Sequence, residues 1–356
     1  MHFSRRMALA GGVSAASYFS LLNKQAVAKN WPFVCGINCS GLEDTPPGVP
    51  TANMLKYYAE KKVKYIRLPG LWEHFQPHLG QELNEDYCKI YEAVLKQCTK
   101  LGLSVVCEPC HNYGHYSQDG KMLCFGDGVL TPSIFAKFWE YFCKRFRHHS
   151  CIVAWDIMNE PSNLKGDTQQ RANAWKDAAQ AAIFAIRQCD RKRPIWVEGY
   201  GYSSAQAWPT ANPTLHTLQD PAKKIVFSAH CYLDRDNSGT HYYWDEEKLA
   251  GDQVSGGPLL PDVGIRRIEP FVGWLKEYGL RGNIGECGAG REDTKGKPGN
   301  EGWLSALDKT LSYCREQRLP FFYWGTGTDF GTVYPYTLEP DQGKEQPQWQ
   351  VLRKYL

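Results

Sequence analysis

The chain has 356 residues, of which 42% are hydrophobic, and its formal net charge is +3. This length suffices for one large domain or two ordinary ones. The excess of positive charge comes from Arg5, Arg6 and Lys24 within the first 28 residues, which contain no acid. The remainder is neutral, so we expect no nucleic acid and no anionic membrane as a partner.

The N-terminal segment has the pattern of an export signal. Two arginines precede an uncharged apolar run at residues 7–22, and Ala-Val-Ala at 26–28 has the small-x-small form of a cleavage site. The arginine pair resembles a twin-arginine signal; an ordinary secretory signal with two chance arginines is the alternative. The run is shorter than the ~20 residues of a membrane span.

We therefore predict a signal at residues 1–28 and one domain over residues 29–356. The mature protein is expected to be secreted or periplasmic, not bound to a membrane, and monomeric. Its thirteen cysteines form no paired zinc pattern. In an exported protein they predict one or more disulfides, with at least one free thiol because the number is odd.

Short runs rich in β-branched and aromatic residues alternate with helical patterns along the chain. The strands are predicted at residues 33–38, 65–68, 104–109, 152–158, 195–198, 225–229, 283–286 and 319–324. Between them, apolar residues recur at helical spacing, as in Tyr87, Tyr91, Val94 and Cys98. Eight such repeats over ~300 residues predict an α/β fold, a single-domain (β/α)8 barrel. An open, doubly wound sheet is the alternative, but no G-x-G-x-x-G follows the first strand.

Functional side chains of such barrels gather at the carboxyl ends of the strands. Polar and aromatic residues occupy these positions here: Asn38, Arg67, His111, Asn112, Asn159, Glu160, Glu198, His230, Tyr232, Glu286 and Trp324. We expect them to form one ring around a single opening.

Two carboxylates of this ring, Glu160 and Glu286, each directly follow a predicted strand. Retaining glycoside hydrolysis needs one protonated carboxyl and one ionised carboxylate, ~5–5.5 Å apart. Close pairing would raise the pKa of one partner and leave the other ionised. The pair predicts this chemistry without a metal or cofactor, although either glutamate alone could be a salt-bridged rim residue.

Several segments occur in an order and at a spacing that suit one known family. They are Gly36-Ile37-Asn38, Ile66-Arg67-Leu68-Pro69, residues 109–114, Ile157-Met158-Asn159-Glu160-Pro161, Val197-Glu198-Gly199, residues 230–234, Asp236-Asn237-Ser238-Gly239-Thr240 and Gly285-Glu286. This combination resembles glycoside hydrolase family 5, and within it the endo-β-1,4-glucanase branch of fungi and bacteria.

The resemblance implies a role for each matching residue. Glu160 would be the acid/base and Glu286 the nucleophile, which Tyr232 orients and Arg67 keeps ionised. The remaining assignments are to substrate contact and support: Asn159 would hold the substrate 2-hydroxyl, His111 and His230 would line the flanking subsites, Trp324 would be a stacking platform, and Asn38 would support the site.

Structural alternatives exist for some of these residues. Arg67 could be a rim arginine, and His111 and His230 could be core histidines; a metal role is disfavoured because the H-x-H pair of barrel metallohydrolases is absent. Asp156 is expected to point into the barrel as a structural residue. No role is assigned to Glu108 or Glu198.

The chain departs from the family pattern at Cys39, Cys110, Cys231 and Cys287, which we expect to crowd the site. An insertion at residues 251–264 would add a wall, and Trp324 is not followed by a second aromatic cluster. The predicted substrate is a β-linked polysaccharide or oligosaccharide, first β-1,4-glucan. Mannan, xyloglucan or a bacterial exopolysaccharide are alternatives, as is a carbohydrate-binding barrel without catalysis.

Overall fold

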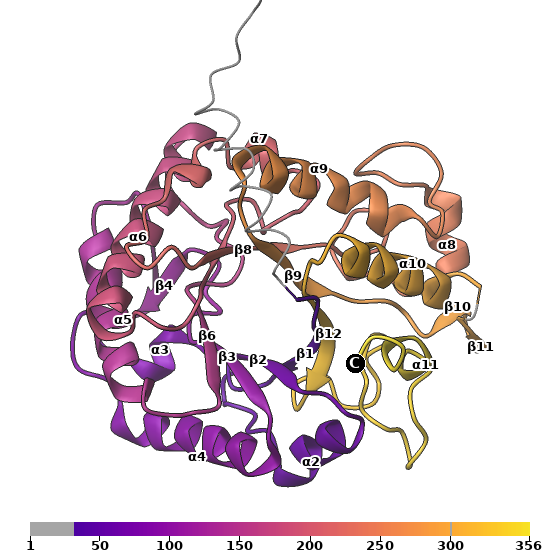
Figure 1. Cartoon of the computed structure of the whole chain (residues 1–356), viewed down its shortest axis with the longest axis horizontal. Helices are drawn as coiled ribbons and strands as arrows, with labels where there is room; N and C mark the ends of the chain where they lie inside the picture. The colour runs from indigo at the N-terminus through magenta and orange to yellow at the C-terminus, as the bar shows by residue number, and fades with distance from the viewer. Residues whose placement is uncertain (1–31, 300) are drawn as a thin grey trace, which may run out of the picture.

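A computed structural model of the chain describes residues 32–299 and 301–356. Eight parallel strands form a closed barrel in the order β1-β12-β9-β8-β7-β6-β3-β2, with helices around it (Figure 1). The barrel strands are β1 (Cys35–Ser40), β2 (Tyr65–Pro69), β3 (Ser104–Glu108), β6 (Ile152–Asp156), β7 (Ile195–Glu198), β8 (Ile225–His230), β9 (Gly282–Cys287) and β12 (Phe321–Gly327). The predicted single-domain (β/α)8 barrel is confirmed.

The barrel closes where the first and last strands meet, side by side in indigo and yellow in Figure 1. β1 pairs with β12 through Cys35 and Phe321, and with β2 through Ile37 and Ile66. Because β1 has a partner on each side, the open-sheet alternative is wrong.

The outer layer consists mainly of six long helices. They are α2 (Ala52–Glu60), α4 (Glu85–Leu101), α5 (Pro132–Phe146), α6 (Thr168–Cys189), α9 (Val263–Tyr278) and α10 (Trp303–Glu316). In α4 the predicted apolar stripe is buried, Asn84 caps the first turn and Gly102 ends the helix with φ 69°. The shorter elements are α3 (Trp72–Phe75), α7 (Trp208–Ala211), the 3₁₀ helix η1 (Leu215–Thr217), α8 (Trp244–Ala250) and α11 (Trp349–Leu352).

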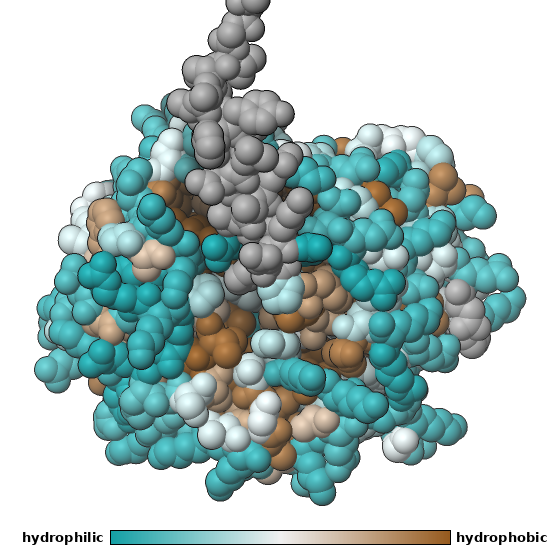
Figure 2. Space-filling view, viewed as in Figure 1, coloured by the Kyte–Doolittle hydropathy of each residue, from teal (hydrophilic) through white to brown (hydrophobic). Residues whose placement is uncertain are grey.

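Two small hairpins follow barrel strands. β4 (His115–Gln118) pairs with β5 (Lys121–Cys124) after β3, and β10 (Glu292–Thr294) pairs with β11 (Lys297–Pro298) after β9. In the face shown in Figure 2, hydrophobic side chains gather mainly near the barrel axis, whereas hydrophilic ones cover much of the surrounding helices. None of the helices in the described residues has the length and apolar character needed to cross a membrane.

The prediction of disulfides is wrong for this structure: all thirteen cysteines are free, and all except Cys189 are buried. The four cysteines expected to crowd the site, Cys39, Cys110, Cys231 and Cys287, have no exposed surface and pack in the hydrophobic core. Burial raises the pKa of the Cys231 thiol to about 12. A buried thiol of this kind behaves as a small hydrophobe, so these cysteines lie behind the site rather than in it.

Candidate active site

Arg67 is the centre of a buried polar network at the carboxyl end of the barrel. It has no exposed surface, and burial alone would lower its pKa, but four nearby carboxylates raise it well above the usual value. Its five N–H donors reach Asp156 Oδ2 at 2.8 Å, Asn38 Oδ1 at 3.0 Å, Glu286 Oε1 at 2.7 Å, Asn159 Oδ1 at 3.0 Å and Glu198 Oε1 at 2.8 Å. Arg67 therefore lies beneath the opening and not at its rim.

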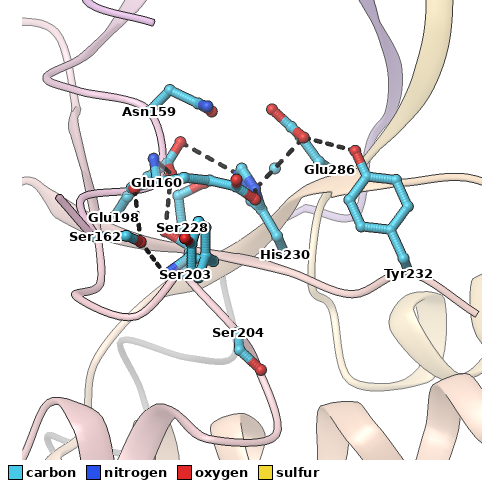
Figure 3. A network of polar contacts seen from close by, with 12 residues as sticks. Asn159, Glu160, Ser162, Glu198, Ser203, Ser204, Ser228, His230, Tyr232 and Glu286 are labelled. Carbon is cyan, nitrogen blue, oxygen red and sulfur yellow. Dashed lines mark hydrogen bonds and ion pairs between the residues drawn. The ribbon is translucent and has the colours of Figure 1, made fainter. Parts of the chain in front are cut away.

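Glu286, at the end of β9, receives a hydrogen bond on each carboxylate oxygen. Arg67 donates to Oε1, and the Tyr232 hydroxyl donates to Oε2 at 2.7 Å (Figure 3). The loop after β8 holds Tyr232 in place: the Tyr232 N–H donates to Asn237 Oδ1 at 2.7 Å. Gly239 has φ 74°, and a Cβ there would lie 2.7 Å from the Tyr232 ring. A glycine is required for this close approach.

Glu160 reaches the opening through an unusual backbone conformation. β6 ends at Asp156, and the Asn159 N–H then donates to the Cys110 carbonyl at 3.0 Å. Glu160 has φ 43°, in the left-handed region, which is uncommon for a residue with a side chain. The predicted strand at 152–158 extends two residues beyond the end of β6, although the Ile157 N–H still donates to the Trp196 carbonyl of β7 at 3.2 Å.

The Glu160 carboxyl lies against His230, whose Nδ1 is 2.7 Å from Glu160 Oε1. One carboxylate oxygen of Glu160, one nitrogen of His230 and one carboxylate oxygen of Glu286 all lie within 4.8 Å of one another. Burial raises the pKa of Glu160; the interaction with His230 opposes this shift, and the charge of Glu286 adds to it. The two glutamates are thus close neighbours in different environments.

Glu198, to which the sequence assigned no role, is fully buried at the end of β7. Its Oε2 accepts from the Glu160 N–H at 2.6 Å and from the Ser203 hydroxyl at 2.8 Å. Although burial opposes the shift, the charges of His230 and Arg67 lower the pKa of Glu198 to about 2. Its position at a strand end was the same signal that identified the other site residues.

Glu108, which is buried, pairs with the half-buried His111 on the β3 side of Arg67. His111 Nδ1 lies 3.0 Å from Glu108 Oε2, which is 3.5 Å from Arg67 Nη2. Burial opposes protonation of His111, but its hydrogen bond to Glu108 raises its pKa to about 9. His111 therefore lies at the edge of the opening in a polar environment and is not an apolar core histidine.

A cleft of about 670 Å³ opens above this network. Of the predicted site residues, it is lined by His111, Glu160, His230, Tyr232, Glu286 and Trp324. The rings of Trp324 and His111 are parallel within 9°, with centroids 5.8 Å apart. Arg67, Asn38 and Asn159 are not among the lining residues and lie almost fully buried.

The amide of Asn159 is engaged at both ends. Its Oδ1 accepts from Arg67, and its Nδ2 is 3.2 Å from His111 Nε2. Asn38 accepts from Arg67 and donates to the Gly285 carbonyl at 3.0 Å. Both asparagines thus link residues from different strands beneath the cleft.

Further aromatic residues line the cleft that the sequence did not identify: Tyr113, Tyr202, Tyr242 and Tyr334. Tyr202 is 57% exposed. The expectation that no second aromatic cluster follows Trp324 is wrong. The Phe330 ring stacks on that of Tyr334, with 4.3 Å between ring centroids, and its centroid lies 5.6 Å from that of Trp324. From the insertion at 251–264, Val254 lines the cleft.

The donor atoms of Glu160, His230 and Glu286 are close enough to surround a cation. In this arrangement, however, they are already engaged, since both Glu286 oxygens accept hydrogen bonds and His230 Nδ1 pairs with Glu160. Asp234, Asp236 and His241 form a comparable group beside the cleft. There Asp234 accepts from the backbone N–H groups of residues 239–241 and so organises its own loop.

Comparisons with known proteins agree with this geometry. The chain matches the family profile of Cellulase (glycosyl hydrolase family 5) over residues 28–329. It is similar to the probable endo-beta-1,4-glucanase B of Aspergillus oryzae, with 28% identity over 348 residues that cover 94% of this chain and 93% of the relative.

Two solved structures have the same fold. The endoglucanase Cel5A of Pseudomonas stutzeri, in complex with cellobiose, is 31% identical with a TM-score of 0.77, over 92% of this chain and 95% of that one. XacCel5A, in complex with cellopentaose, is 27% identical with a TM-score of 0.77, over 92% of this chain and 100% of that one. The chain therefore belongs to the cellulase family, glycosyl hydrolase family 5, and is a glycoside hydrolase.

Proposed function

We propose that this enzyme hydrolyses β-1,4-linked glucan with retention of configuration, with Glu160 as acid/base and Glu286 as nucleophile. The observation that carries the proposal is the short separation of these two carboxylates. One oxygen of Glu160 and one oxygen of Glu286 lie within 4.8 Å of each other, and both residues line the cleft. Retaining enzymes place the two groups ~5–5.5 Å apart, whereas inverting enzymes leave ~6.5–9.5 Å for a water molecule.

The surroundings of the two glutamates support different roles. Arg67 and Tyr232 donate to opposite oxygens of Glu286, and both contacts stabilise a negative charge, as a nucleophile requires. Burial raises the pKa of Glu160, which favours the protonated form that a general acid needs.

The reaction proceeds in two displacements. Glu160 gives its proton to the glycosidic oxygen while a Glu286 oxygen bonds to the anomeric carbon and the bond to the leaving sugar breaks. Glu286 is then an uncharged ester, so it no longer raises the pKa of Glu160. Glu160, now ionised, takes a proton from water as the water oxygen attacks the same carbon, and the Glu286 carboxylate is released.

The choice of β-1,4-glucan rests on the relatives and on the cleft. Structures similar to this chain were solved with cellobiose and cellopentaose. Trp324, Tyr113 and Tyr202 expose aromatic rings along the cleft, and such rings stack on the apolar faces of sugars. Asn159 contacts the substrate 2-hydroxyl. To do so, its amide exchanges its present contact with Arg67 or with His111.

We also propose that residues 1–28 direct export, by the twin-arginine route, and are then removed. These residues lie outside the part of the chain that the structure describes. The start of the family match at residue 28 supports the boundary.

The test is a panel of polysaccharides, including glucan, mannan, xyloglucan and bacterial exopolysaccharide, with sizing of the products. Proton NMR of the first product gives its anomeric configuration, and a 2-fluoro-glycoside inhibitor should add one glycosyl group to Glu286, located by peptide mass spectrometry. An inverted product or a label on another residue contradicts the mechanism. Preference for another glycan contradicts the substrate alone, and binding without release of reducing ends favours the carbohydrate-binding alternative.

A further inference from the structure

Glu198 is a third carboxylate of the site, and no step of the reaction above uses it. It is completely buried and does not line the cleft. We propose that Glu198 is a positioning residue, which holds the backbone of Glu160 in its left-handed conformation and holds His230 as an imidazolium against the Glu160 carboxyl. The proposal deepens the proposed function and rests on its assignment of Glu160 as the acid/base.

Glu198 holds the backbone of Glu160 through a hydrogen bond. A residue with a side chain is strained at φ 43°, and such strain persists only when the surroundings hold it. Glu198 Oε2 accepts from the Glu160 N–H at 2.6 Å, a charge-assisted hydrogen bond. The same oxygen accepts from the hydroxyl of Ser203, which has φ 51°. Glu198 thus fixes the turn after β6 and the turn after β7 with one oxygen.

His230 lies between two carboxylates. Its Nδ1 is 2.7 Å from Glu160 Oε1, and its Nε2 is 3.2 Å from Glu198 Oε1 (Figure 3). His230 Nε2 has no hydrogen-bond partner among the described residues, so this second contact is an ion pair. An imidazole with a carboxylate near each nitrogen is held in its charged form.

The ionisable groups around His230 and Glu198 come from five strands or the turns that follow them. They are Arg67, Glu108, Asp156, Glu160, Tyr232 and Glu286. Burial lowers the pKa of His230, but Glu198, then Glu286, and then the hydrogen bond to Glu160 raise it well above the usual value. Among these groups Glu198 is the one that faces His230 and lies away from substrate.

The imidazolium determines where the acid carries its proton. An imidazolium at His230 donates its Nδ1–H to Glu160 Oε1, which is 2.7 Å away, so the transferable proton is directed to Oε2. The same positive charge stabilises ionised Glu160 and so opposes the rise of the Glu160 pKa that burial causes. Glu198 therefore acts on Glu160 in two opposed ways, directly as a like charge and indirectly through His230.

The variant Glu198→Gln separates these two actions because it keeps the shape and removes the charge. If Glu198 acts through His230, loss of the imidazolium leaves ionised Glu160 less stabilised. The basic limb of the kcat/KM profile against pH then moves to higher pH. In addition, kcat falls on the order of 10²-fold because the Glu160 carboxyl is no longer held in its orientation. If Glu198 acted only as a neighbouring charge, the basic limb would move to lower pH, and this result would overturn the proposal.

The decisive readout is independent of activity. NMR of histidine labelled in the ring reports the protonation of His230 in the enzyme without substrate. We expect wild-type His230 to remain doubly protonated from about pH 5 to pH 8, and His230 of the Glu198→Gln variant to titrate within that range. A His230 signal that stays doubly protonated in the variant contradicts the proposal.

Two further variants complete the design. Glu108→Gln also removes a buried carboxylate beside Arg67 but faces His111, so it should leave the His230 titration unchanged. Glu198→Asp keeps the charge and shortens the side chain; it should lower kcat without moving the basic limb, and it replaces Glu198→Gln if that variant does not fold. Failure of the 2-fluoro-glycoside to label Glu286 would contradict the proposed function. The His230 titration tests the role of Glu198 independently of that labelling.

Discussion

Arg67 and Glu286 form a buried ion pair at the base of the cleft, with 2.7 Å between Nη1 and Oε1. The same guanidinium also pairs with Asp156 and Glu198 and lies 3.5 Å from Glu108. A single cation therefore interacts with several buried carboxylates from different strands, so we expect it to contribute both to the stability of the barrel and to the ionised state of Glu286.

We expect Arg67→Lys to destabilise the protein by about 3–5 kcal/mol, because a lysine has three donors and leaves buried carboxylates unpaired. Urea unfolding measures this loss. The surface variant Arg171→Lys is the control and should unfold like the wild type. An Arg67→Lys variant of unchanged stability would contradict the role of Arg67 as the centre of the network.

Removal of either glutamate should be distinguishable by chemical rescue. Glu286→Ala is expected to lose at least ~10³-fold in kcat on an activated aryl β-glycoside. Glu160→Ala is expected to lose at least ~10³-fold in kcat on cellulose fragments. On the activated aryl β-glycoside, whose leaving group needs no proton, azide should restore turnover with both variants, giving an α-glycosyl azide from the first and a β-glycosyl azide from the second. The opposite pairing of products would exchange the two roles, and Glu82→Gln, on the surface, serves as the unaffected control.

The Tyr232 hydroxyl donates to Glu286 Oε2 at 2.7 Å. Tyr232→Phe should lower kcat by about 10- to 100-fold, equivalent to ~1.4–2.7 kcal/mol of lost stabilisation. Tyr91→Phe is a matched control, since it removes another buried hydroxyl, which donates to the Leu68 carbonyl at 3.1 Å. Both variants should lose similar stability in thermal unfolding, and only the first should lose activity; an equal effect on kcat would contradict the role of Tyr232.

Asp190 predicts a pH dependence of stability away from the site. Burial opposes the shift, but the hydrogen bonds from Arg193, the Lys192 N–H and Trp155 lower the pKa of Asp190 to about 2. Its carboxylate therefore stabilises the fold above the unfolded pKa of ~3.9, and this contribution is lost as the pH falls towards 2. Asp190→Asn should flatten the dependence of the unfolding free energy on pH between these values, whereas exposed Asp177→Asn should not.

The cysteines allow a direct chemical test of the core. Since every cysteine except Cys189 is buried, the folded enzyme should react quickly with one equivalent of a thiol reagent and with thirteen after denaturation. Cys189→Ser should abolish the rapid reaction. Rapid labelling of Cys39 or Cys287 would contradict their placement behind the site, and a mass deficit before reduction would indicate disulfides.

The sequence by itself determined the barrel and most of the ring of polar residues at its carboxyl end. Strand and helix patterns depend on local apolar spacing, and strand ends share one edge of a parallel barrel, so Glu160, Glu286, Arg67 and Tyr232 could be predicted to meet. The family motifs added a role for each of them. The apolar stripe of α4 was also predictable, because apolar residues recur at helical spacing within this one helix.

Only the tertiary structure decided what surrounds these residues. The left-handed backbone of Glu160 and its hydrogen bond to Glu198 arise where the turns after β6 and β7 meet, and no periodic pattern reports such a contact. The same holds for Tyr334, which reaches the cleft from a loop beyond Trp324, and for Cys39 and Cys287, whose chemistry is set by burial rather than by their place beside the motifs. Local spacing fixes which strand a residue ends, whereas the closure of the barrel and the packing of its loops fix what that residue touches.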